Sequence, residues 1–134
     1  MSVIKHISKL QQINSRRLDR ILQSISEMQQ TINKLNGNLQ EEKSRVTGLI
    51  EAYKNYKRNA YSNALVNRIV SQSDLRLFKS ELEKMEVEIV SSQEKQRGIM
   101  DEIQAKMKEV ELLNAEARKF NIKLEKYNLM RELV

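Results

Sequence analysis

Apolar residues recur along the first half of the chain at alternating spacings of three and four residues. Fourteen of the seventeen positions in this series are apolar when Tyr and Ala are counted. A chain with 40% apolar residues would reach about seven such positions by chance. A 3.5-residue period held this long predicts a helix with one apolar seam that packs against a partner helix. The seam positions are Ile4, Ile7, Gln11, Asn14, Leu18, Ile21, Ile25, Met28, Ile32, Leu35, Leu39, Glu42, Val46, Leu49, Tyr53, Tyr56 and Ala60.

The same spacing restarts in the second half of the chain. Thirteen of its seventeen positions are apolar. These positions are Leu75, Phe78, Leu82, Met85, Ile89, Ser92, Gln96, Ile99, Ile103, Lys106, Val110, Leu113, Ala117, Phe120, Leu124, Tyr127 and Arg131. Two long helices with matching seams are thus predicted, and each can bury its apolar stripe against the other.

A polar segment between the two repeats predicts a short connection. Asn63 and Asn67 are poor helix formers. Ser71 is suited to cap the free amides of a following helix, and the carboxylate of Asp74 is favoured near the positive end of that helix. A new helix is therefore expected to start at this serine.

These signals together predict an all-α fold, an elongated antiparallel two-helix coiled-coil hairpin formed by a monomer. We expect a single domain over residues 1–134, with a first helix at about 3–62, a tip at about 63–70 and a second helix at about 71–132. A helix of this length would extend for about 90 Å. The competing arrangement is a homodimer, in which the two segments pair with another copy of the chain.

The polar positions of the two seams allow a prediction of register. In a hairpin folded near residue 67, facing residues have numbers that sum to about 134. Glu42, the only charged seam residue of the first helix, then lies opposite Ser92. Such a polar layer costs stability but specifies register. The same rule places Ile4 beside Arg131, so that both ends of the chain finish together.

One turn signal interrupts the first repeat. Asn36, Gly37 and Asn38 form a combination that is typical of turns. The seam nevertheless passes through it in phase, and all three residues fall on the outer face, where a glycine costs about 1 kcal/mol. We expect a soft spot or gentle bend there, with a true break as the alternative.

Composition supports a helical protein and narrows its chemistry. The chain has no Pro, Trp or Cys, and 31% of its residues are charged, a profile typical of long helices and coiled coils. Residues 1–70 carry 12 basic and 5 acidic side chains (+7), and residues 71–134 carry 12 and 13 (−1). The basic residues are scattered among acids, which favours a solvated face over nucleic-acid binding. We expect neither a membrane-spanning segment nor a leader sequence.

No arrangement of residues typical of an active site is found. His6 is the only histidine, and it lies near a terminus. The cluster of Glu81, Glu83, Glu86 and Glu88 is more typical of a solvated helix face than of an acid–base pair. The sequence therefore predicts a protein that is not an enzyme and that has no catalytic residues, cofactor or metal.

Aromatic side chains cluster in the half of the hairpin nearest the tip. They are Tyr53, Tyr56, Tyr61 and Phe78. These rings either fill wide parts of the seam or protrude as anchors for a partner. Four aliphatic residues at the tip, Leu65, Val66, Ile69 and Val70, strengthen the second interpretation, since a tip has little core in which to bury them.

Two segments carry a resemblance to a known family. The stretch Leu49–Tyr56 (LIEAYKNY), a short polar tip and the stretch Phe78–Lys84 (FKSELEK) resemble the FliJ/YscO family. These proteins are the central stalks of flagellar and type III secretion export ATPases. One family tyrosine position falls on Ala52, with Tyr53 beside it. The resemblance covers about residues 45–90 in detail and the whole chain in architecture.

The resemblance implies a protein that couples a hexameric export ATPase to the export gate. It would act in the bacterial cytoplasm, at the cytoplasmic face of a flagellar or virulence-associated secretion apparatus. Its implied partners are that ATPase, the cytoplasmic domain of the gate protein and secretion chaperones. The implied gate-contact residues are Leu49, Tyr56, Phe78, Leu82 and Met85. The end formed by the two termini would enter the ATPase ring, and the basic residues near it are the candidate contacts: Arg16, Arg17, Arg20, Arg118 and Lys119.

Three alternative functions follow from the residues alone. A coiled-coil chaperone or scaffold would bind client proteins without any ATPase. A homodimeric coiled coil would use the same seams between two copies, and a basic helix pair would bind nucleic acid in a salt-sensitive manner. For the five basic residues, a solvated surface is the competing interpretation.

Overall fold

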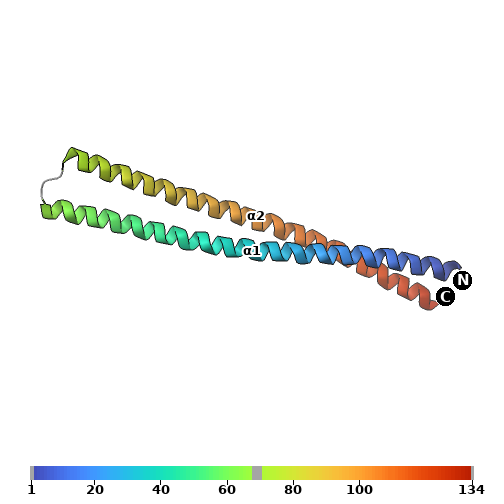
Figure 1. Cartoon of the computed structure of the whole chain (residues 1–134). Coiled ribbons are helices and arrows are strands. Elements are labelled where there is room, and N and C mark those ends of the chain that lie inside the picture. The colour runs from blue at the N-terminus through green and yellow to red at the C-terminus, as the bar shows by residue number, and fades with distance from the viewer. Residues whose placement is uncertain (1, 68–70, 134) are drawn as a thin grey trace. The chain divides into compact units, whose positions relative to one another are not determined.

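The computed structural model describes residues 2–67 and 71–133, with side-chain exposure described outside 64–70. It contains two α-helices, α1 (Ser2–Asn67) and α2 (Gln72–Leu133), which pack against each other in an antiparallel hairpin (Figure 1). No strand occurs in the described part of the chain. The prediction of an all-α two-helix hairpin with coiled-coil packing is therefore confirmed.

The first helix extends further than the sequence suggested. It ends at Asn67 rather than near residue 62, so residues 63–67 of the expected tip are helical. Ala64 and Leu65 are strong helix formers, and each neighbouring asparagine opposes the helix by less than about 1 kcal/mol. The rest of the expected tip, residues 68–70, lies outside the described residues.

The start of α2 has the predicted cap. The backbone N–H of Asp74 donates a hydrogen bond to Ser71 Oγ at 3.1 Å, and the N–H of Leu75 donates to the Ser71 carbonyl at 3.1 Å. Asp74 is the acidic residue of the first turn, and Arg131 is the basic residue of the last turn. Both charges lie where the helix dipole favours them.

The turn signal in the first repeat does not interrupt α1. Asn36, Gly37 and Asn38 are helical and exposed. A Cβ atom added at Gly37 would meet nothing within 4 Å. The alternative of a true break is therefore wrong. In a long helix whose seam stays in phase on both sides, the local cost of one glycine is too small to end the helix.

The chain divides into two compact units, and both helices contribute to each. We call Met1–Lys34 with Ile103–Val134 the terminal unit, and Leu35–Glu102 the central unit. Within the terminal unit the chain ends lie close to each other (Figure 1), and Ile4 and Arg131 line the same hollow, as the predicted register requires.

Burial follows the predicted seams in both units. The most deeply buried apolar side chains are all seam residues: Ile7, Ile25, Ile103 and Ala117 in the terminal unit, and Leu39 and Val46 in the central unit. The other seam residues are half-buried or buried, except three that are exposed. These three, Ile4, Leu75 and Arg131, each lie within about a turn of a helix end, where few neighbours cover them.

Candidate interaction surfaces

A polar layer sets the register of the central unit. Ser92 is 3% exposed, and its hydroxyl donates a hydrogen bond to Glu42 Oε2 at 2.6 Å. The predicted pairing of these two residues is therefore confirmed. Because the short bond satisfies a buried hydroxyl with a carboxylate, a shifted register would leave both groups without this partner.

Two aromatic rings pack against each other in the seam of the same unit. The rings of Tyr56 and Phe78 stack with centroids 5.6 Å apart and an interplanar angle of 23°. Their numbers also sum to 134, the value set by the polar layer. Offset stacking of this kind adds to the energy of burial. These two rings therefore pack against each other across the hairpin and are not free anchors.

Tyr53 makes a polar contact beside this stack. Its hydroxyl donates a hydrogen bond to Glu86 Oε1 at 2.9 Å, and Lys57 Nζ lies 5.9 Å from the centre of its ring. The hydrogen bond to the Glu86 carboxylate, together with desolvation and the carboxylate charge, raises the pKa of Tyr53 above its ordinary value. The sequence pattern missed Glu86 because that residue lies off the seam, on its flank.

The residues implied to contact an export gate lie together in the central unit. All of them occupy seam positions, and all are half-buried: Leu49, Tyr56, Phe78, Leu82 and Met85. Of the two interpretations of the aromatic rings, filling the seam rather than protruding as anchors describes Tyr56 and Phe78. Each of the five side chains also keeps part of its surface in solvent, so the seam edge offers contact area without any rearrangement. Their role in binding stays a prediction.

Exposed apolar residues flank the connection between the helices. Tyr61 on α1 and Leu75 and Leu77 on α2 are all more than half exposed. The heptad repeat includes Leu75 but not Leu77, which lies two positions further on. The side chains of the four tip aliphatics, Leu65, Val66, Ile69 and Val70, lie outside the described residues.

The five basic candidates for ATPase contact lie in the terminal unit. All are exposed: Arg16, Arg17, Arg20, Arg118 and Lys119. The two ion pairs of the described residues, Lys84–Glu81 at 3.5 Å and Lys106–Glu109 at 3.9 Å, involve none of them. Their charges are therefore available to a partner, and their role in ATPase contact stays a prediction.

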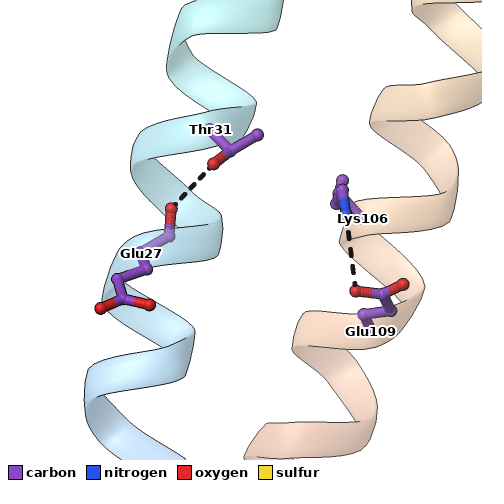
Figure 2. A network of polar contacts seen from close by, with 4 residues as sticks. All are labelled: Glu27, Thr31, Lys106 and Glu109. Carbon is purple, nitrogen blue, oxygen red and sulfur yellow. Dashed lines mark hydrogen bonds and ion pairs between the residues drawn. The ribbon is translucent and has the colours of Figure 1, made fainter.

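Polar contacts within single helices let polar residues occupy the seam of the terminal unit. Figure 2 shows Lys106, a seam residue, with its ammonium group 3.9 Å from Glu109 Oε2 on the same helix. The aliphatic part of such a lysine can cover the seam while its charge stays near solvent. The same figure shows a bond of this kind off the seam, where the hydroxyl of exposed Thr31 donates to the Glu27 carbonyl at 3.1 Å. Buried Asn14 likewise donates to the Leu10 carbonyl of its own helix at 2.7 Å.

One cross-helix polar network lies near the chain ends. Gln11 Nε2 donates to Asn128 Oδ1 at 2.6 Å, and Arg131 Nη1 donates to Gln11 Oε1 at 3.1 Å. The amide of this polar seam residue thus has partners on α2 at both of its atoms. A hollow beside it is lined by basic residues that include Lys5 and Lys9, with the exposed His6.

Comparison with models of protein families finds no match for the chain, and comparisons with curated proteins and with solved structures likewise find none. Over the described residues, neither helix contains a stretch that is long and apolar enough to cross a bilayer. The same residues contain no group of three or more His, Cys, Asp or Glu that could hold a metal ion.

Proposed function

We propose that this chain is a non-enzymatic central stalk of the FliJ/YscO type, which couples a hexameric export ATPase to the gate of a bacterial type III secretion apparatus. The observation that carries the proposal is that the two segments resembling the FliJ/YscO family, Leu49–Tyr56 and Phe78–Lys84, lie together. Both segments with the family pattern meet in one unit, where Tyr56 and Phe78 stack at facing positions. The protein would act in the bacterial cytoplasm, at the cytoplasmic face of the secretion apparatus.

The gate surface in this proposal is the edge of the aromatic seam. Half-buried Leu49, Leu82 and Met85 continue the stack of Tyr56 on Phe78 along the same seam. A partner that covers this edge would bury ring and aliphatic surface that is already held in one geometry. Little conformational entropy would then be lost on binding.

The ATPase surface is the basic part of the terminal unit. Arg16, Arg17 and Arg20 lie within about one turn of α1 and are exposed, as are Arg118 and Lys119 on α2. Cations at such rim positions raise association rates and select acidic partners more than they add affinity. The chain contributes two surfaces and the stiffness of a hairpin, and ATP hydrolysis belongs to the partner.

The first experiment measures ATP hydrolysis by the export ATPase of the same organism, with and without this protein. We expect stimulation by the wild-type chain. The variant Arg16→Glu/Arg17→Glu/Arg20→Glu should lose it. A matched variant with the same charge change in the central unit, Arg45→Glu/Lys54→Glu/Arg58→Glu, should keep it, because those exposed residues lie outside the proposed ATPase surface.

A second variant separates the gate surface from the ATPase surface. Tyr56→Leu/Phe78→Leu removes both rings but keeps apolar volume in the seam, so that the hairpin still folds. It should still stimulate the ATPase but bind less tightly to the purified cytoplasmic domain of the gate protein. A wild-type chain that neither stimulates nor binds the ATPase would refute the stalk, and a chaperone or scaffold would then be favoured.

A further inference from the structure

A second apolar stripe runs along the outer face of α2 in the terminal unit. It repeats the alternating spacing of three and four residues on the side of the helix away from the seam. Its apolar members are Leu112, Ala115, Ile122, Leu129 and Leu133. The four large ones are 72%, 54%, 60% and 88% exposed in that order, so that α1 leaves them uncovered. We call these five residues, together with Lys119 and Lys126, the outer stripe.

The spacing of the outer stripe is the spacing that a partner helix recognises. Seven consecutive positions of the repeat span residues 112–133, which is about 32 Å of helix. Scattered exposed leucines are ordinary on a protein surface, but a row in heptad register is the seam of a coiled coil. A third helix can therefore pack along the back of α2 without disturbing the hairpin.

Charge decides which kind of helix fits. The two polar positions of the outer stripe are both lysines, Lys119 and Lys126, and both are exposed. No carboxylate interrupts the stripe. Acidic residues outnumber basic ones at the flanking positions. One side has Glu111, Glu125 and Glu132 with Arg118, and the other has Glu109 and Glu116 with Lys123. A complementary helix has carboxylates within its apolar row and basic residues on its flanks.

A second copy of the chain does not meet this requirement. An antiparallel pairing of the whole outer stripe with itself is centred on Ile122 and sets Lys119 against Lys126 of the other copy, twice. A parallel pairing in register sets each lysine against itself. Like charges at such an interface are unfavourable. An anionic membrane is also disfavoured, because the five flanking carboxylates outnumber the four cations of the stripe and its flanks, Lys119, Lys126, Arg118 and Lys123.

We propose that the outer stripe binds an amphipathic helix of another protein, with acidic residues in its apolar row opposite Lys119 and Lys126 and with basic flanks. This inference goes beyond the proposed stalk function and does not rest on it. It concerns the outer face of one helix, and it holds whether or not the chain stimulates an ATPase. Lys119 is shared with the proposed ATPase surface, so the partner helix and the ring would compete there.

The test uses two synthetic helical peptides of about three heptads. Both have leucine at the positions facing the apolar members and lysine on the flanks. One has glutamate at the two positions facing the lysines, and the other has lysine there. Because Lys119 and Lys126 lie symmetrically about Ile122, one design serves for parallel and antiparallel binding. Dissociation constants are measured by fluorescence anisotropy with the full chain.

The wild-type chain should bind the glutamate peptide at least about tenfold more tightly than the lysine peptide. Lys119→Glu/Lys126→Glu should reverse that preference. Ile122→Ser should weaken binding, whereas Val87→Ser should not. Val87 is the matched control because it is an exposed residue at the same outer heptad position of α2, but in the central unit. Circular dichroism confirms that all variants are folded.

Three results would overturn the proposal. The first is equal or absent binding of the two peptides by a folded wild-type chain. The second is concentration-dependent self-association in sedimentation that Ile122→Ser abolishes, which would make the occupant a second copy. The third is binding to phosphatidylglycerol vesicles, but not to the glutamate peptide, that is lost in Lys119→Glu/Lys126→Glu. Failure of the ATPase assay with success here would refute the stalk alone.

Discussion

The hydrogen bond between Ser92 and Glu42 should carry a measurable share of the stability of the hairpin. The variant Ser92→Ala removes the donor from a side chain that is 3% exposed, and it leaves the half-buried carboxylate without its 2.6 Å partner. A hydrogen bond to a charged group contributes about 1.5–3 kcal/mol. We therefore expect Ser92→Ala to lower the free energy of unfolding by about 2 kcal/mol.

The neighbouring serine provides the control. Ser91 is exposed, so Ser91→Ala should change stability by less than about 0.5 kcal/mol. The double variant Glu42→Leu/Ser92→Ala removes both polar groups and turns the layer apolar. It should be at least as stable as the wild type, because replacing both partners of a buried polar pair by apolar groups is neutral or stabilising.

Urea denaturation followed by circular dichroism at about 222 nm reports the loss of helix. The expected order of stability is Ser92→Ala lowest, wild type and Ser91→Ala equal, and the double variant equal or higher. A Ser92→Ala variant that matches Ser91→Ala would show that the bond is not formed in solution. A double variant less stable than the wild type would refute the argument that the layer specifies register at a cost in stability.

Three further perturbations test local features. Gly37→Ala should stabilise α1 by about 0.5–1 kcal/mol, seen as a raised Tm, because the new Cβ meets nothing within 4 Å in a helix interior. Ser71→Ala should destabilise by about 1 kcal/mol in urea denaturation, because it removes the N-cap of α2. For Tyr53, ultraviolet titration as the difference from a Tyr53→Phe variant should give a pKa above the ordinary 10.0, which Glu86→Gln should lower.

Each of these has a clear contrary result. A lower Tm for Gly37→Ala would mean that the turn signal is used as a turn after all. An unchanged midpoint for Ser71→Ala would mean that the cap is not formed. The raised pKa of Tyr53 contributes stability that is present below pH 10 and is lost as pH rises through the folded value. If Glu86→Gln leaves the pKa of Tyr53 unchanged, the hydrogen bond to Glu86 is not the cause of the raised pKa.

The seams could be predicted from the sequence because burial in a coiled coil depends mainly on spacing. Ile7, Ile25 and Val46 are deeply buried where the repeat places them. The register could be predicted because Glu42 and Ser92 are rare polar interruptions, and their pairing satisfies both groups. Seam burial and register could be predicted because the residues on each side of every such contact belong to this chain.

Features that depend on small local energies could not be predicted in the same way. The end of α1 at Asn67 reflects a balance of propensities that differ by fractions of a kcal/mol per residue. The contact of Tyr53 with Glu86 depends on how two side chains on the seam flanks lean toward each other, which a heptad pattern does not describe. Leu75 fits the repeat, yet it lies too near the start of α2 to be covered.

The partner of the outer stripe cannot be read from heptad spacing alone. Its spacing is the same as that of the seam, but its large apolar side chains are exposed, because α1 packs on the opposite face of α2. The partner must then be inferred from charge: Lys119 and Lys126 disfavour a second copy, and the flanking carboxylates disfavour an anionic membrane. What remains is a helix with acidic residues in its apolar row. Polar residues within an apolar row therefore specify the partner in both places: Glu42 with Ser92 inside the chain, and Lys119 and Lys126 with an acidic helix outside it.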